Sequence, residues 1–541
     1  MRHTNDELAQ NVAERWCWEV THRDDTRVAR RLSCQQEVDG VYRLDEGAVL
    51  DDFFHFLDQI GVMAVLAEAR GTAMQREMVP YVQDVLLYGL KTRFGIERMN
   101  ALPALLFSDA ALMPLVGFKA QHVRQGVCQR GAATRQGERT PGPISPAILA
   151  HHIVKLNVWD LECVFNGAIR AWAKAGVFSP QVTGMADGTD LETTERYTGC
   201  GQVTRTVRLE DTWGTGHEIA VTVYGWKVLL LLAAVTKMPL AVQVGQSQEH
   251  EALWARALVT QARMHLAGYA RLSQVFCERG FMEGTTRWWL DQQGIRLVVP
   301  AKTNMAVTAE AHAHAAAGED LTVGRRVHTV RHGQGRTAWT ERVATEVVGM
   351  TGLTTYDHYG TPEHKRHANR RDFQAHRINA VVVRKWQGQD QGPAGKTVFL
   401  TNAPVEQPLP PFEDDDDRSL IEHCCSKEAK QPWDLGHPPQ KTERAVRVHV
   451  LFTLRLFALA TAYRLPCERE ATGREPVGWQ RWRRQLLEQT RELVIVFAQD
   501  YDGIFHLAEY SLLVGVKRKD RPPGIGTRQD VLAKYRLMSR H

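Results

Sequence analysis

Residues 273–300 read SQVFCERGFMEGTTRWWLDQQGIRLVVP, and this stretch decides the fold class. The apolar run Ser273–Cys277 predicts a strand that ends at Glu278. A helix is predicted from about Glu283 to Gln293, and the run Ile295–Pro300 predicts the next strand. The alternation of strands and helices indicates an α/β fold.

The residues upstream extend this pattern. A short strand is predicted to end at Asp187, and two longer strands, Ile219–Ala233 and Leu240–Val244, are predicted to form an antiparallel pair. A helix is predicted from about Glu249 to Leu266. The resulting order of strand, strand, strand, helix, strand, helix, strand fits the ribonuclease H-like fold, in which carboxylates at the ends of the first and fourth strands lie side by side. Asp187 and Glu278 stand at those two ends.

Composition excludes several classes of protein. The chain is 43% hydrophobic and 24% charged, which is ordinary for a globular protein. The most apolar stretch, Ala445–Tyr463, contains Arg447, His449 and Arg455, so it predicts a buried helix and not a membrane span. Nine cysteines without a Cys-x-x-Cys pair fit reduced thiols, and the N-terminus does not resemble a secretory signal. The expected location is the cytoplasm, and the sequence has no Gly-x-x-x-x-Gly-Lys loop for a nucleotide.

Positive charge gathers in patches, although the formal net charge is only +5. One patch runs from Lys119 to Arg139 with a single acid, a second from Lys365 to Lys385, and a third, Trp479–Arg484, interleaves aromatic residues with arginines. A single patch of this kind also fits a solvated helix face. Several patches along one chain favour an extended nucleic-acid partner.

The first patch follows a predicted helix. Gly117 is expected to turn the chain, and Lys119 and Arg124 then lie on a second helix, as in a helix-turn-helix that contacts DNA. Because Pro114 falls inside the first predicted helix, a plain helical hairpin is the favoured interpretation.

A third acid follows a region with strand-like runs. Beyond the acidic run Glu413–Asp417, a helix is predicted that carries Arg418, Glu422 and Lys430. On a single helix Arg418 and Glu422 are one turn apart, and Lys430 lies two turns further on a nearby face. This face would combine a carboxylate with two cations that can contact phosphate. Three carboxylates brought together hold two divalent metals in many enzymes that break phosphodiesters.

With these residues the chain resembles the DDE transposases of the insertion-sequence-4 family, the group with a β insertion between the second and third acids. The resemblance covers most of the chain, from about residue 86 to residue 463. It rests on these motifs: Asp187-Gly188-Thr189, Tyr224-Gly225-Trp226-Lys227, Arg279-Gly280-Phe281, Pro300-Ala301-Lys302, and Arg418, Glu422 and Lys430, which look like the Arg, Glu and Lys of the family's Tyr-Arg-Glu-Lys signature.

The resemblance implies an activity and its cofactor. Asp187, Glu278 and Glu422 would be the catalytic residues and would bind two Mg²⁺ ions, or Mn²⁺ as a substitute, with Asp187 as the bridging ligand. The enzyme would cut DNA at the ends of an insertion sequence, and the freed 3′-hydroxyls would attack target DNA. Arg418 and Lys430 would bind DNA phosphate. The expected partners are the terminal inverted repeats and target DNA, with at least a dimer in the synaptic complex.

Two departures from the family pattern keep alternatives open. The family's second acid is Asp, whereas this chain has Glu278, and the signature's Tyr is here Asp415. A longer side chain must fold back to preserve the octahedral shell that Mg²⁺ demands. One alternative is therefore a decayed transposase that only binds DNA. The other is a ribonuclease H-like nuclease that cuts DNA without joining it.

Changes in pattern predict several domains, as expected for 541 residues. The predicted architecture is a ribonuclease H-like mixed-sheet domain with a β insertion, flanked by helical regions. The predicted segments are 1–140 (a helical N-terminal domain that binds DNA), 150–302 (the first part of the catalytic domain), 303–410 (an inserted β-rich domain), 411–465 (the final catalytic helices) and 466–541 (a basic helical C-terminal region).

Overall fold

The chain forms two compact units in a computed structural model. One unit combines Met1–Ala168 with Glu428–His541, and the other is Ile169–Lys427; we call them the terminal unit and the central unit. The residues that the structure describes are 22–43, 53–54, 56–68, 81–109, 112–118, 132–133, 139–140, 144–210, 216–318, 321–332, 338–354, 378–387, 397–408, 427–430, 433–472, 492–499, 501–516 and 526–537.

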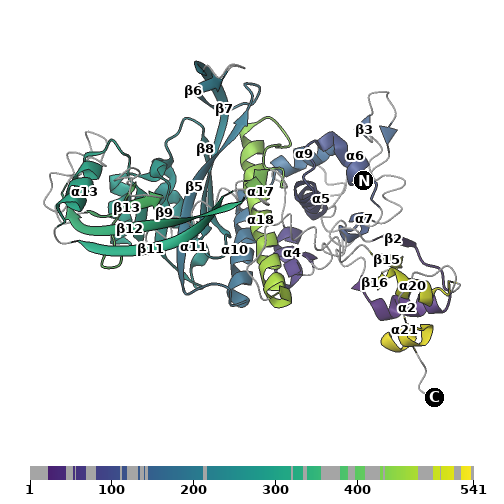
Figure 1. The fold of residues 1–541 in the computed structure, drawn as a ribbon. Coiled ribbons are helices and arrows are strands. Elements are labelled where there is room, and N and C mark those ends of the chain that lie inside the picture. The colour runs from purple at the N-terminus through teal and green to yellow at the C-terminus, as the bar shows by residue number, and fades with distance from the viewer. Residues whose placement is uncertain are drawn as a thin grey trace. The chain divides into compact units, whose positions relative to one another are not determined.

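A ten-stranded mixed sheet organises the central unit (Figure 1). Its strands are β5 (Gln181–Thr193), β6 (Gly201–Glu210), β7 (Gly216–Ala233), β8 (Pro239–Gln246), β9 (Arg271–Cys277), β10 (Arg296–Pro300), β11 (Thr322–His332), β12 (Trp339–Leu353), β13 (Ile378–Gln387) and β14 (Thr397–Thr401). The order is β11-β12-β13-β14-β10-β9-β5-β7-β6, and β8 also pairs with β7. β5 is antiparallel to β7 and parallel to β9, which is in turn parallel to β10.

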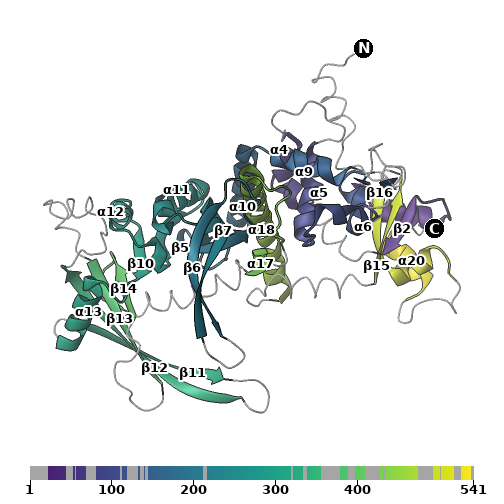
Figure 2. The same ribbon diagram turned by 90° about the horizontal axis from the view of Figure 1, so that it is seen from above.

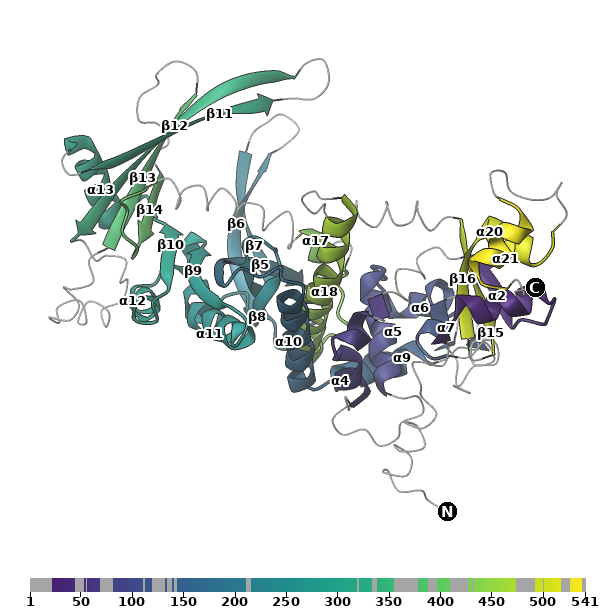
Figure 3. The same ribbon diagram turned by 90° about the horizontal axis from the view of Figure 1, so that it is seen from below.

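The apolar strands near the centre of this sheet form its core. β7 contributes the run Val228–Ala233, in which every residue is buried, and such continuous apolar runs are typical of strands covered on both faces. The helix α11 (Ala255–Leu266) lies against β8, β7 and β9, and α12 (Gly284–Gln292) lies against β10 (Figure 3). Two 3₁₀ turns, η2 (Glu251–Trp254) and η3 (Arg279–Phe281), precede these helices.

The strands between residues 303 and 410 continue the same sheet. β14 pairs antiparallel with β10 along Pro300 and Val299, and β13 and β12 follow. β11 and β12 pair along their whole shared length and form a long curved ribbon (Figure 2). The helix α13 (Ala306–Ala317) contacts β12 and β13, and it ends at Gly318, whose φ of +76° suits a residue without a Cβ.

The terminal unit contains a helical body. Its elements are α4 (Val62–Glu68), α5 (Tyr81–Arg93), η1 (Met99–Ala101), α6 (Leu102–Leu105), α7 (Leu112–Leu115), the pair β3 (Ala132–Ala133) and β4 (Arg139–Thr140), α9 (Pro146–Val154), α10 (Val158–Lys174), α17 (Lys427–Lys430) and α18 (Glu443–Thr472); α10 and α17 run across the boundary between the units. α18 is long and apolar enough to span a membrane over Glu443–Arg464, but 83% of that apolar window is buried inside the protein. This burial is typical of a core helix, as its sequence predicts.

Residues from both ends of the chain build a small second sheet in the terminal unit (Figure 1). Its strand order is β1 (His22–Arg23), β16 (Tyr501–His506), β15 (Leu493–Ala498) and β2 (Gly40–Arg43), and its helices are α2 (Asp25–Ser33), α20 (Leu507–Leu513) and α21 (Arg528–Lys534). Val28, Leu32, Val496 and Phe505 are buried together in its core. The hydrophobic contacts thus tie the beginning of the chain to its end.

The order of strands and helices predicted for residues 219–300 is confirmed, including the helix start, where Glu283 is the N-cap of α12. The prediction that the first strand ends at Asp187 is wrong. β5 continues to Thr193, because Asp187–Thr193 pair with β7 residue by residue, and this pairing overrides the turn preference of Asp and Gly. The strand β6 has no counterpart in the sequence prediction.

The prediction of a helical C-terminal region at 466–541 is wrong for part of the segment, although α20 and α21 are helices. Leu493–Ala498 and Tyr501–His506 are strands, because short runs that contain β-branched and aromatic residues favour strands over helices. The predicted N-terminal helical domain likewise contains strands, β1 and β2, which pair with these two. The turn predicted at Gly117 is present, with a φ of +84°.

Candidate active site

Parallel pairing of β5 and β9 brings Asp187 and Glu278 together. Ala186 lies beside Cys277 in the register, and the Glu278 amide donates a hydrogen bond to the Ala186 carbonyl at 3.3 Å. Glu278 keeps an extended backbone, with φ −66° and ψ 156°. Because side chains alternate along strands, Asp187 and Glu278 follow this matched pair onto the same face of the sheet.

The two acids differ in their surroundings. Asp187 is buried, with 5% of its surface exposed, and its Oδ1 accepts a hydrogen bond from the Gly188 amide at 2.8 Å. Glu278 is half-buried and stands at the N-cap position of η3, but its side chain does not cap that turn. Its carboxylate therefore has no capping role there.

Other acids nearby have structural roles. Glu283 caps α12 by accepting hydrogen bonds from the amides of Thr285 and Thr286 at 2.9 and 2.7 Å. Burial raises the pKa of the Glu283 carboxyl, but the hydrogen bonds from Thr285 and Thr286 outweigh burial, so the pKa is lowered overall. Asp190 pairs with Arg205, and this hydrogen bond raises the pKa of the guanidinium.

A carboxylate that the sequence prediction did not select lies behind the two acids. Glu251 is the first residue of η2, five residues after the end of β8, and its Oε1 is 3.1 Å from the Lys227 Nζ. Gly188 points to the face opposite Asp187, and a Cβ placed on Gly188 would be 3.2 Å from the Glu251 Oε1. No strand-end pattern marks Glu251, because it lies five residues beyond β8 and Glu249 is nearer to that strand.

The remaining predicted site residues are not brought to this face by any described contact. Lys430 is exposed at the end of α17, in the terminal unit. Arg418, Glu422, Lys119 and Arg124 lie outside the described residues. Within the described part of the chain, no group of three or more His, Cys, Asp or Glu side chains is close enough to hold a metal ion. The described residues supply two of the three predicted ligands, and carboxylate oxygens are the ligands that Mg²⁺ prefers.

The terminal unit holds a second cluster of charged residues, in its core. Lys91 forms an ion pair with Asp434, and the His437 Nδ1 is 2.6 Å from the other Asp434 oxygen. The His449 Nε2 is 3.0 Å from the Asp434 carbonyl, which can only accept, so Nε2 carries the proton and Nδ1 accepts from the Tyr88 hydroxyl at 2.7 Å. Burial lowers the pKa of His449 to about 3, with a further contribution from the Lys91 charge. The imidazole is therefore neutral.

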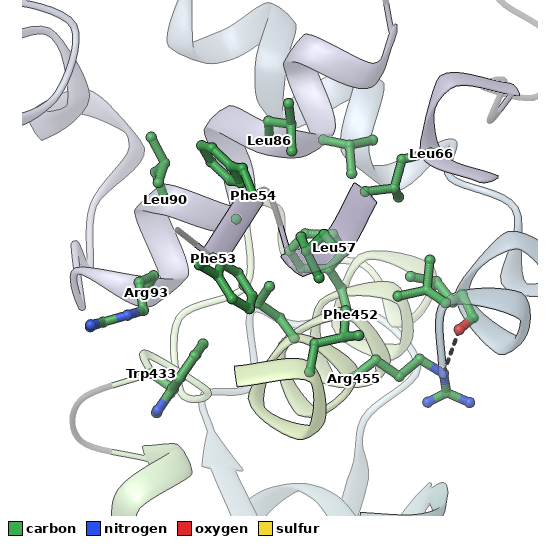
Figure 4. A pocket seen from close by; sticks show the side chains of 16 residues that line it. Phe53, Phe54, Leu57, Leu66, Leu86, Leu90, Arg93, Trp433, Phe452 and Arg455 are labelled. Carbon is green, nitrogen blue, oxygen red and sulfur yellow. Dashed lines mark hydrogen bonds between the residues drawn. The ribbon is translucent and has the colours of Figure 1, made fainter. Parts of the chain in front are cut away.

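An apolar cavity also lies in the terminal unit (Figure 4). Phe53, Phe54, Leu57 and Phe452 are among its lining residues. Arg455 lines it with its aliphatic chain, while its Nε donates to the Leu161 carbonyl at 3.1 Å. The described residues that line it are apolar apart from Arg93, Arg455 and the indole of Trp433.

No protein-family model matches the chain, and no curated protein matches it significantly.

Proposed function

We propose that the protein is a transposase that cuts DNA at the ends of an insertion sequence and joins the 3′-hydroxyl ends to target DNA. The observation that carries the proposal is the hydrogen bond between the Glu278 amide and the Ala186 carbonyl, which sets Asp187 and Glu278 side by side on one face. Their neighbouring motifs, Gly188-Thr189 and Arg279-Gly280-Phe281, match those expected for this class.

The strand pairing supports a ribonuclease H-like core. In the order β8-β7-β5-β9-β10, the first three strands are successively antiparallel, and the last two are parallel to β5. We interpret this as the central arrangement of that fold, extended by the strands β11–β14. On this interpretation, β5 and β9 are the first and fourth strands, which carry the first two acids.

The proposed chemistry assigns a role to each residue. Asp187 and Glu278, with Glu422 as the third ligand, would hold two Mg²⁺ ions, which activate the attacking oxygen and stabilise the leaving oxygen when bound. Arg418 and Lys430 would hold the scissile phosphate, and Lys119 and Arg124 would bind the DNA further away. Two protomers would be needed to bring two ends together, and the reaction would take place in the cytoplasm on chromosomal DNA.

A cleavage assay tests the proposal. Purified protein is incubated with labelled duplexes taken from the DNA that flanks the coding sequence, with Mg²⁺ or Mn²⁺, and nicked and strand-transferred products are resolved. We expect metal-dependent products whose yield falls at least about a hundredfold in Asp187→Ala, since that carboxylate contributes several kcal/mol of charge stabilisation. Glu218→Gln, an exposed acid on β7, is the matched control and should cleave normally.

Three outcomes would contradict the proposal in different ways. Normal cleavage by Asp187→Ala would show that Asp187 is not part of the active site. Binding without cleavage, with activity gained in Glu278→Asp, would identify a decayed copy that lost its chemistry through the longer side chain. Cleavage without any strand-transfer product would identify a nuclease.

A further inference from the structure

Two glycines near the proposed acids face a single carboxylate. Gly188 follows Asp187 directly, and Gly280 lies two residues beyond Glu278. A Cβ on Gly188 would be 3.2 Å from the Glu251 Oε1, and a Cβ on Gly280 would come closer than 3.0 Å to the Glu251 Oε2. Neither glycine has a positive φ. A Cβ would therefore require the Glu251 carboxylate to shift, by a small amount at Gly188, where Leu229 is equally near, and by more at Gly280.

Glu251 is held firmly in this place. Its Oε1 is 3.1 Å from the Lys227 Nζ, and both side chains are only 17% exposed. Lys227 in turn projects from β7, the strand that pairs with β5. The ion pair thus connects Glu251 to the sheet beside Asp187.

The segment around Glu251 is anchored as well. The Glu249 Oε2 accepts hydrogen bonds from the Gln246 amide at 3.1 Å and from the Trp254 Nε1 at 3.2 Å. A Cβ on Gly245 would be 2.5 Å from that same Glu249 oxygen. Residues 246–254 therefore lie close on the sheet, on the face opposite the two proposed acids.

Glu251 cannot serve as the missing third ligand from this position. Gly188 points to the α11 side of the sheet, whereas Asp187 points to the other side. Ala186, Ala255 and Leu258 line a common small cavity, which identifies the Ala186 face as the one that α11 covers. The Glu251 carboxylate contacts the backbone behind the acids and not the space in front of them.

We propose that Glu251, held by Lys227, is a positioning residue that fixes β5 and the turn after β9, so that Asp187 and Glu278 keep the separation that divalent-metal binding requires. This inference rests on the proposed function for its purpose. In this role a fourth acid, behind the sheet, contacts the backbone at Gly188 and Gly280. Removal of groups that orient metal ligands typically weakens metal affinity by about tenfold to a hundredfold.

Metal binding without DNA provides the first test. Mn²⁺ binding to the full-length protein is measured by electron paramagnetic resonance, with Asp187→Ala to identify the site. We expect Glu251→Gln to weaken Mn²⁺ binding about tenfold, because the amide keeps the volume but loses the ion pair. Glu346→Gln is the matched control: Glu346 pairs with Arg325 and Arg384 in the same sheet, away from the acids, and its loss should leave Mn²⁺ affinity unchanged.

A reciprocal size test uses the glycine contact. Gly280→Ala should also weaken Mn²⁺ binding, because its methyl group displaces Glu251, and Gly188→Ala should do so less. Combining Gly280→Ala with Glu251→Ala should cause little additional loss beyond Glu251→Ala alone, since the methyl group then enters vacated space. Two single effects that add in full would overturn the inference.

The outcomes separate this inference from the proposed function. Asp187-dependent Mn²⁺ binding that is unaffected by Glu251→Gln, or the absence of Asp187-dependent Mn²⁺ binding, would overturn the positioning role. Mn²⁺ binding that depends on Glu251, without DNA cleavage, would support the positioning role and contradict the transposase. Thermal unfolding of each variant is recorded. A weakened Mn²⁺ affinity supports the positioning role where the unfolding temperature matches that of Glu346→Gln, because loss of folded protein then cannot cause it.

Discussion

Two lysine–carboxylate pairs in this protein have different surroundings. The Lys91–Asp434 pair in the terminal unit is 0% and 1% exposed, whereas the Lys227–Glu251 pair in the central unit is 17% exposed on both sides. Burial lowers the pKa of Lys91 and raises that of Asp434, because loss of hydration disfavours the charged form of each group. The same pair of residue types stabilises the fold in the terminal unit and, in our proposal, positions the metal ligands in the central unit.

The hydrogen bonds of the two carboxylates explain the difference. Asp434 is contacted by Lys91 and His437, and its backbone carbonyl by His449, so it connects α5, the loop after α17 and α18. Such a network stabilises a single arrangement of helices. Glu251 has Lys227 as its ion-pair partner, and its carboxylate lies against two glycines that adjoin Asp187 and Glu278. Glu251 therefore lies close to the chain segments that carry Asp187 and Glu278.

The largest expected effect breaks the buried pair. Lys91→Met should lower the free energy of unfolding by about 3–5 kcal/mol, because it leaves the Asp434 charge buried without its cation. Denaturant unfolding measures this loss. The double variant Lys91→Met/Asp434→Leu should recover most of it, since no charge is then left in the core. If Lys91→Met were as stable as the parent protein, the Lys91–Asp434 pair would have no role in stabilising the fold.

Asp187→Asn should show the opposite pattern. We expect cleavage to fall at least about a hundredfold, equivalent to about 2.7 kcal/mol, while the free energy of unfolding changes by less than about 1 kcal/mol. The reason is that the amide has the same shape as the carboxylate but does not bind the metal. Asp434→Asn is the crossed control: it should destabilise the fold and leave cleavage by the remaining folded protein intact. Equal losses of cleavage and of stability in Asp187→Asn and Asp434→Asn would show that the two carboxylates do not have separate roles.

The pH dependence of stability sharpens the comparison further. Burial holds the folded pKa of His449 at about 3, below its ordinary value of 6.5. The unfolded chain therefore binds a proton below pH 6.5 that the folded chain does not. Stability from this group is fully present above pH 6.5 and decreases by up to about 1.4 kcal/mol per pH unit as the pH falls from 6.5 toward 3.

Unfolding measured between pH 8 and pH 5 tests this dependence, with His449→Gln as the reference. The variant should have a flatter profile than the parent protein, and subtracting the two profiles removes the contributions of other titrating groups. Parallel profiles would show that His449 gains its proton in the folded state as readily as in the unfolded chain.

The smallest expected effect concerns an exposed cation. Lys430→Ala should change the free energy of unfolding by less than about 0.5 kcal/mol, because the side chain lies at the surface. If Lys430 binds phosphate, DNA affinity should weaken and the slope of log affinity against log salt should decrease by about one. Binding measured at several salt concentrations provides this slope. An unchanged slope would exclude a phosphate contact at Lys430.

Prediction from sequence succeeded where local patterns decide structure. The strand Ser273–Cys277, the helix that Glu283 caps and the strand Ile295–Pro300 are present within a residue or two, because apolar period and capping chemistry act over a few residues. It failed at β5 and β15. There, pairing with partners distant in sequence extended one strand past Asp187 and turned an expected helical region into a sheet.

The amino-acid pattern alone was enough to predict the α/β order of the central unit and the strand that ends just before Glu278, since both follow from neighbouring residues. Only the tertiary structure decided that β5 and β9 pair in the register that puts Asp187 beside Glu278, and that Lys227 and Glu251 meet behind them. It also brought the Glu251 carboxylate against Gly188 and Gly280. The physical reason is that register and close approach depend on contacts between segments far apart along the chain, which local propensity does not encode.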